Sequence, residues 1–379
     1  MFLVVGFSIG ASKLAGQHGY QLDEMLGSYI SVHPALMVFG VIGGLLLAEK
    51  IEIMNKFLIL GRIPISYTIV LTLLLGVLFL SLGYGIDFSI LKYAGSALIA
   101  LAGILFLWFM VSRRNPGNTG IKLIMGAALM ALSISSIAES ITSATDSSSV
   151  ALLLLSFPIL YILGERIELG QMRNIGNSKM RMLFISAILI PVFLFVSILL
   201  QFRFIDQVLF DGSILFLTLM VYISIKFDPL TRKLKIHGKF QSFMQLGVVS
   251  SYAWLLVGIV LYFIQVNVER GFMDPATHSI ALGFIGLFII AHSPIIFPLT
   301  LKLRVDTTRV TKLPLYAMNL AVFLRVGGDL ISTGSNVGNI MAYSSIYVLI
   351  LAVLLFFMNI MKIRINTNDT SNAAAKNSG

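Results

Sequence analysis

The sequence predicts an all-α fold: a polytopic membrane helical bundle of about 12 transmembrane helices. Of its 379 residues, 57% are hydrophobic and only 12% are charged, and the mean hydropathy is +0.93. Soluble domains are far less apolar than this. The apolar residues also form long unbroken runs, and a run of about 20 residues crosses a bilayer as a helix. Runs of this length favour helices over the strands of a membrane barrel.

The apolar runs give the expected helices in chain order. The first is the weakest, because 1–12 is short and resembles the apolar core of a signal peptide without its basic start. The sixth, 149–164, is also short for a span. The polar C-terminal end predicts one transmembrane domain, 1–365, followed by a disordered cytoplasmic tail, 366–379. The runs are 1–12, 26–48, 63–84, 88–111, 119–140, 149–164, 181–201, 207–225, 242–265, 276–300, 313–333 and 340–361.

Lysine and arginine alternate sharply between the two sets of loops. The loops after the even-numbered runs, together with the C-terminal end, hold 22 of the 27 basic residues, whereas the alternate loops hold four. By the positive-inside rule, the basic loops and both termini face the cytoplasm of a cell membrane. The side of the charge-poor loops is called the outer side below. The net charge of +10 comes from basic residues in the loops on one side of the membrane. The positive-inside rule accounts for this excess, so we expect contact with lipid and no binding of nucleic acid.

The residue types present restrict the possible chemistry. The chain has no cysteine, which excludes disulfides, zinc–thiolate sites, iron–sulfur clusters and thiolate-ligated haem. A metal would have to use histidine, methionine, carboxylate or backbone ligands. The sequence contains no hydrolase triad, phosphate-binding loop or zinc-protease helix, so whether the protein is an enzyme stays open.

Two histidines stand near the outer ends of apolar runs. His33 lies about five residues into the second run and His278 about one turn into the tenth, so both are roughly 5–8 Å deep. Asp274 as N-cap and Pro275 at the first helical position are expected to start the tenth helix, and Pro34 to kink the second. Two neutral imidazoles at matching depth suit the axial positions of a haem iron. Hydrogen bonds to neighbouring helices are the alternative, although ionisable groups inside a bilayer are usually functional.

Glycines follow both histidines on nearly the same helical face. Gly40 and Gly44 follow His33, and Gly286 follows His278. Small residues at such positions let either a second helix or a flat macrocycle approach the backbone.

The other three histidines are weaker candidates. His292 lies near the inner end of the tenth run, where Pro294 and Pro298 disturb the helix. It could ligate a metal, accept a proton or cap the disturbed backbone. His18, in the first outer loop, could contribute to a copper-type site but fits a solvated loop better. His237 belongs to a basic cytoplasmic loop.

Charged residues inside the spans are few. Arg325 and Asp329 lie one helical turn apart in the eleventh run and form either a structural ion pair or a site at which Arg325 binds a haem propionate. Glu139, at the outer end of the fifth run, could handle protons or lie at the interface. The inner end of the sixth run is expected to hold an interfacial charge cluster of Glu165, Arg166 and Glu168.

Four segments carry a resemblance to a known family. HPALMVFGVIGG, LGERI, HSIALGFIGLFIIAH and LAVFLRVGGDL resemble the NnrS family, twelve-span membrane proteins that contain haem and copper and are associated with nitric oxide metabolism and nitrosative stress. The layout is more distantly similar to subunit one of haem–copper oxidases, in which histidines of spans two and ten ligate a haem. The resemblance implies a b-type haem on His33 and His278, with His292 as a further metal ligand.

The chain also departs from the family pattern. The second histidine and the glutamate of the family's span-two motif are replaced here by Pro34, Ala35 and Leu36, and AHSPIIFP keeps only a histidine of the element after span ten. Few ligands for copper therefore remain.

The resulting expectation is a haem-binding membrane protein of nitric oxide or respiratory metabolism. Electron transfer, gas binding and protection from nitrosative stress are the candidate roles, with redox proteins or another membrane subunit as partners. If two histidines ligate the iron, no open position is left for a gas. Two other classes stay open: a twelve-span secondary transporter, for which neither repeated halves nor a midplane site is evident, and a non-catalytic subunit of a respiratory complex.

Overall fold

The computed structural model describes residues 8–9, 32–56, 64–112, 119–141, 147–170, 176–200, 203–232, 238–268, 271–301, 311–331 and 335–376. These residues form helices joined by turns, and none of them is in a strand. The predicted all-α class is therefore confirmed.

The described helices follow the apolar runs closely. Nine of them are long and apolar enough to cross a membrane, and a tenth, shorter apolar stretch covers Ile124–Ala138. The count of twelve stays a prediction. The helices are α3 (His33–Ala35), η1 (Leu36–Gly43), α4 (Gly44–Lys56), α5 (Pro64–Gly85), α6 (Ser89–Ser112), α7 (Thr119–Ile141), α8 (Ser148–Gly170), α9 (Asn177–Leu200), α10 (Arg203–Phe227), α11 (Pro229–Arg232), α12 (Lys239–Val268), α13 (Met273–His278), η3 (Ser279–Gly286), α14 (Leu287–Leu301), α15 (Leu313–Ile331) and α16 (Asn336–Lys376).

The chain divides into two compact units, and each is described by itself. Unit 1 contains 1–51, 58–228 and 262–270, and unit 2 contains 52–57, 229–261 and 271–379. His33 belongs to unit 1, whereas His278, His292 and Arg325 belong to unit 2.

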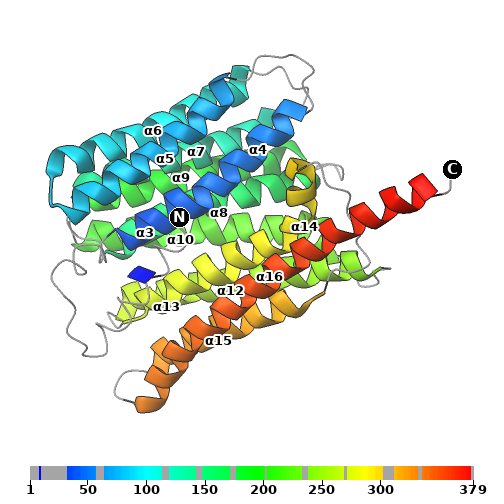
Figure 1. Cartoon of the computed structure of the whole chain (residues 1–379). Helices are drawn as coiled ribbons and strands as arrows, with labels where there is room; N and C mark the ends of the chain where they lie inside the picture. Colours follow the sequence, from blue (N-terminus) through cyan, green and yellow to red (C-terminus); the bar gives the residue numbers. More distant parts are fainter. Residues whose placement is uncertain are drawn as a thin grey trace. The chain divides into compact units, whose positions relative to one another are not determined.

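Unit 1 is built around helix α8, most of which is buried. Helices α5 and α6 form a hairpin beside the His33 helix, and α7, α9 and α10 pack around α8 (Figure 1). Glycines bring the hairpin together, since a Cβ on Gly95 would lie 2.5 Å from the backbone nitrogen of Leu80. Close backbone approach of this kind is typical of membrane helices, which associate through small residues.

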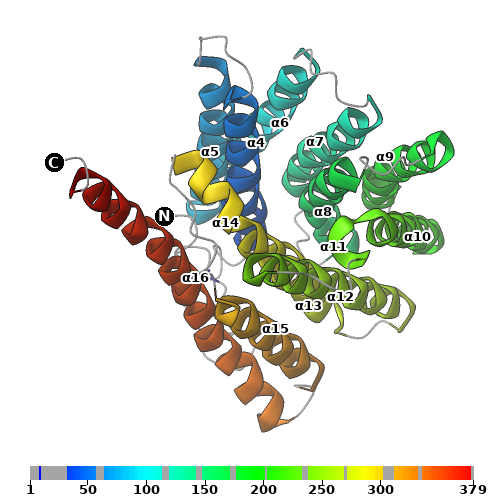
Figure 2. The same ribbon diagram turned by 90° about the vertical axis from the view of Figure 1, so that its right-hand side faces the viewer.

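Unit 2 contains a helix that changes its winding. Segments α13, η3 and α14 are continuous from Met273 to Leu301, and the middle segment η3 is a π-helix. Helices α15 and α16 lie side by side in both views (Figure 2). They approach closely because Gly328 has no side chain: a Cβ there would lie 2.6 Å from the nitrogen of Ala342.

The helix starts differ from the expectations. The second helix begins at His33, so Pro34 lies in the first turn, where its missing N–H is tolerated, and not at a mid-helix kink. The N-cap of the tenth helix is Phe272 and not Asp274, which lies inside the first turn of α13. Helix α16 extends to Lys376, and the disorder expected of 366–379 stays a prediction. A helix once formed propagates at little cost, so an apolar span can extend into a polar segment.

Candidate functional site

His278 is the last residue of α13 and is half-buried. Its Nδ1 lies 2.8 Å from the backbone oxygen of Asp274, one turn earlier. Because a carbonyl oxygen only accepts, Nδ1 carries the proton of this bond. Metal-ligating histidines generally have this arrangement, in which a carbonyl or carboxylate fixes the other ring nitrogen.

A buried polar atom next to His278 adds to this site. Ser279 is fully buried, and no hydrogen-bond partner for its hydroxyl is found among the described residues. Buried hydroxyls are normally paired, and an orphaned one often marks a place where a ligand or water belongs.

His33 begins α3 and is also half-buried. Beyond Ala35 the helix winds as the π-helix η1 for eight residues, Leu36–Gly43. The His278 helix does the same, because the eight-residue π-helix η3 starts directly after that histidine. Each π-helix also contains a buried phenylalanine six residues after its histidine, Phe39 or Phe284. Since π-helices are rare and occur frequently at functional sites, this repeated element singles out the two predicted histidines.

The glycines of the π-helices serve helix packing. A Cβ on Gly286 would lie 2.6 Å from Cε of Met318 on α15, and one on Gly43 would lie 3.4 Å from Cε1 of Phe157 on α8. Gly286 thus admits a neighbouring helix, which is the first of the two roles considered for it. At Gly44 the nearest atom, of Leu74, is 3.9 Å away.

The structure brings Arg325 to the level of His278 within unit 2. The backbone at Gly247 faces both Ala291 and Leu315, and Gly286 faces Met318. The tenth helix and α15 are therefore antiparallel neighbours, since residue numbers fall along one as they rise along the other. Arg325 lies seven residues after Met318 on α15, and His278 lies eight residues before Gly286 on the tenth helix. Because the two helices are antiparallel, Arg325 and His278 lie at about the same level.

Arg325 is buried and pairs with Asp329 in its own helix. The Nε–Oδ2 distance is 3.3 Å, and the side chains are 9% and 12% exposed. Helix α16 adds Asn339 at the level of Asp329, and its buried Oδ1 has no hydrogen-bond partner among the described residues. The predicted ion pair thus exists in the structure, within a polar region at the outer end of unit 2.

His292 repeats the geometry of His278 fourteen residues further along the same helix. Its Nδ1 lies 2.9 Å from the backbone oxygen of Phe288, and the two rings stack with centroids 3.9 Å apart. Among the described residues, no group of three or more His, Asp or Glu side chains is placed to hold a metal ion. His18 and His237 lie outside the described residues, and the side chain of Glu139 is not described.

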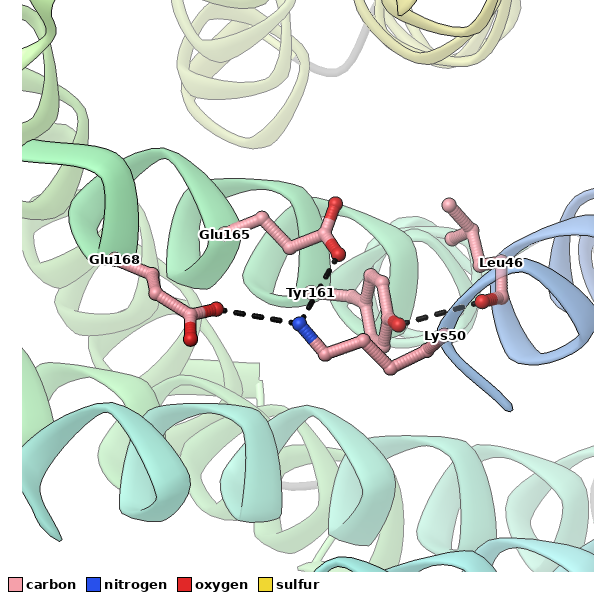
Figure 3. A network of polar contacts seen from close by, with 5 residues as sticks. All are labelled: Leu46, Lys50, Tyr161, Glu165 and Glu168. Atoms are coloured by element: carbon pink, nitrogen blue, oxygen red, sulfur yellow. Dashed lines mark hydrogen bonds and ion pairs between the residues drawn. The ribbon is translucent and has the colours of Figure 1, made fainter. Parts of the chain in front are cut away.

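The predicted charge cluster at the inner end of α8 gains a partner on α4 (Figure 3). Lys50 Nζ lies 3.5 Å from Glu165 Oε1 and donates to Glu168 Oε2 at 3.2 Å. One turn away, Tyr161 donates its hydroxyl proton to the backbone oxygen of Leu46 at 3.3 Å. Figure 3 shows the lysine reaching from α4 between the two glutamates of α8. The network ties the inner half of the His33 helix to α8.

Arg166, the third residue of the predicted cluster, bonds to a carboxylate of another segment. It donates from Nε and Nη2 to the two carboxylate oxygens of Asp228, at 2.6 and 2.5 Å. The two side chains are only 2% and 0% exposed. Sequence reasoning placed Arg166 at the interface and did not identify Asp228, which follows α10 and is distant in sequence.

A second network that the sequence did not reveal lies at the outer end of unit 1. Ser149 on α8 and Ser197 on α9 are buried, with hydroxyl oxygens 2.9 Å apart, and both bond to Asp206 on α10. Helices α8 and α4 run in parallel, since Gly43 meets Phe157 and Lys50 meets Glu165. His33 lies ten residues before Gly43, and the same count back from Phe157 reaches the start of α8. His33 therefore lies at the level of the network that includes Ser149.

The comparisons with known proteins assign a family. No curated protein and no solved structure matches the chain. The model of the family described as a domain of unknown function (DUF8744) matches residues 3–361, nearly the whole length. The chain therefore belongs to the DUF8744 family.

Proposed function

We propose that the chain is a haem-binding protein of the cell membrane, with His278 of unit 2 and His33 of unit 1 as the candidate ligands, each argued within its own unit. The observation that carries the proposal is the repeated element in which a histidine at a predicted outer helix end is followed by an eight-residue π-helix. For His278, the bond from Nδ1 to the Asp274 oxygen is also the kind of contact that orients metal-ligating histidines. For His33, the support lies within its own helix, where η1 follows Ala35.

Two neighbouring groups suit a carboxylate-bearing cofactor. Arg325 lies at the level of His278 and can bind a propionate through its planar guanidinium group, with Asp329 balancing the remaining charge. The buried Ser279 hydroxyl offers a hydrogen bond that no described residue takes up. The copper implied by the NnrS likeness has no comparable support among the described residues.

Electron transfer is the role that fits two histidine ligands best. A bound haem supplies a one-electron couple, and if histidines ligate both of its faces, no position is left for a gas. The protein would then serve nitric oxide or respiratory metabolism by exchanging electrons with a redox protein or another membrane subunit. With a single ligand, the iron could bind nitric oxide, and gas binding or protection from nitrosative stress would follow.

The deciding experiment is an absorption and electron paramagnetic resonance spectrum of the protein purified from cells supplied with haem. We expect a haem Soret band in the wild type and loss or reshaping of the low-spin signal in His278→Ala and in His33→Ala. His237→Ala, in the basic loop, is the control and should leave the spectrum intact. Absence of haem from the wild type would overturn the proposal, and a spectrum indifferent to both substitutions would overturn the ligand assignment.

Ion-coupled transport is the second candidate, and the Lys50 network favours it. Ionisable groups inside a span commonly mark ion or proton pathways, and Lys50 and Glu165 are only 14% and 18% exposed. If this network carries coupling ions, vesicles containing the protein should show a proton flux on a substrate gradient that Lys50→Met abolishes. Lys92→Met, at an exposed ion pair with Asp87, is the matched control.

A further inference from the structure

The π-helix η3 is held by two neighbouring helices. A Cβ on Gly283 would lie 2.5 Å from Cβ and 2.6 Å from Cγ of Trp254 on α12, so the indole side chain occupies the space that a side chain at Gly283 would need. On another side of η3, Met318 of α15 fills the same kind of space at Gly286. The two glycines of this segment therefore each receive a large side chain from a different helix.

Trp254 is fixed in this position by α15. Its Nε1 donates to Oδ1 of Asn319 at 3.0 Å, and Nδ2 of Asn319 donates to the backbone oxygen of Leu315 at 2.8 Å. An indole N–H in an apolar interior needs an acceptor, because leaving it unpaired costs free energy. Moving the indole away from Gly283 would break this bond, so Asn319 holds it against the π-helix.

The winding of η3 decides the direction of the His278 ring. An α-helix turns about 100° per residue, and a π-helix turns less because its bonds span five residues instead of four. Over the eight residues of η3 the difference adds up to roughly a third of a turn between His278 and α14. If η3 rewound as an α-helix, His278 would face a different side of the helix.

We propose that Trp254 and Asn319 are positioning residues that hold η3 in its π-helical form and so orient the His278 ring toward the haem iron that it would ligate. The orientation of His278 toward a haem rests on the proposed function, whereas the hold of Trp254 and Asn319 on η3 does not. In unit 1 an aromatic side chain also packs against a π-helix glycine, since a Cβ on Gly43 of η1 would lie 3.4 Å from Phe157 of α8.

The test uses Trp254→Phe, Asn319→Leu and their combination in the full-length protein. Each single variant removes the bond between the two side chains and keeps most of the buried volume. We expect hydrogen exchange in 279–286 to speed up by about fivefold in either single variant, the change that loss of one neutral hydrogen bond produces. The double variant should accelerate exchange by less than the product of the two single effects, because both substitutions remove the Trp254–Asn319 bond. In the haem-loaded protein, the g-values of the low-spin electron paramagnetic resonance signal should shift, while the haem content stays that of the wild type.

Two control variants separate positioning from general destabilisation. Trp108→Phe changes the other tryptophan, which is 56% exposed on α6, and Asn267→Leu changes an exposed asparagine on α12. Both should leave exchange in 279–286 and the g-values unchanged. Unchanged exchange in both Trp254→Phe and Asn319→Leu, or equal acceleration in the controls, would overturn the inference. Absence of haem from the wild type would instead overturn the proposed function, and the exchange rates would still decide the role of the two residues.

Discussion

Replacing Arg166 by methionine should be among the most destabilising single changes in unit 1. The guanidinium group is 2% exposed and donates two short bonds to a carboxylate that is fully buried. Methionine fills much of the volume but removes the Arg166 guanidinium from the buried Asp228 carboxylate. Breaking one side of a buried ion pair costs about 3–5 kcal/mol, because the remaining charge is uncompensated. We therefore expect the free energy of unfolding of Arg166→Met to fall by about that amount.

The assay is equilibrium unfolding in mixed micelles, followed by circular dichroism. The double variant Arg166→Met with Asp228→Leu removes both charges, so it should recover most of the loss, since apolar replacements of whole buried pairs are often neutral. Lys92→Met, which breaks the exposed pair with Asp87, should change the unfolding curve little. A loss below about 1 kcal/mol in Arg166→Met would show that water reaches the pair and would refute the reasoning.

Three further changes test other parts of unit 1. Tyr161→Phe should lose about 0.5–1.5 kcal/mol in the same unfolding assay, because only the bond to the Leu46 oxygen is removed. Gly95→Leu should reduce the yield of folded protein sharply, because its Cβ would lie 2.5 Å from a backbone nitrogen of α5, whereas Gly176→Leu, with open space around it, should fold normally. The Lys92 ammonium donates to Asp87 and holds the pKa of that carboxyl below its usual value. The stabilisation is therefore present at neutral pH and is lost as the pH falls through the lowered pKa, and carbon-detected NMR should show the pKa return to normal in Lys92→Met.

The helices were predictable because hydropathy is a local property of the sequence. The eleventh run, 313–333, became α15 (Leu313–Ile331), and the tenth began within three residues of its expected start. The Arg325–Asp329 pair could also be predicted, since residues one turn apart on a helix are neighbours. These expectations needed no knowledge of which helices touch.

The π-helices and the long-range polar contacts could not be predicted in this way. Leu36–Gly43 is apolar on all sides, so hydrophobic periodicity gives no sign of a change in winding. The partners of Arg166, Lys50 and Ser149 come from other helices, and only packing decides which ones meet. Asp206 offered a signal, since it is an acid in the first turn of an apolar helix, but nothing in the sequence connected it with two distant serines.

The placement of polar groups along α8 favours a site near the helix ends over a transport site at the midplane. The outer end of this helix holds Ser149 in the network with Asp206, and the inner end holds Glu165 bonded to Lys50. Between them, Phe157 packs against Gly43, and no described charged side chain of α8 lies there. Secondary transporters bind substrates near the midplane at broken helices, whereas α8 is continuous through Pro158. A haem ligand at the outer end, as proposed for His278 and His33, requires no polar midplane, so the arrangement of this helix agrees better with a redox protein than with a carrier.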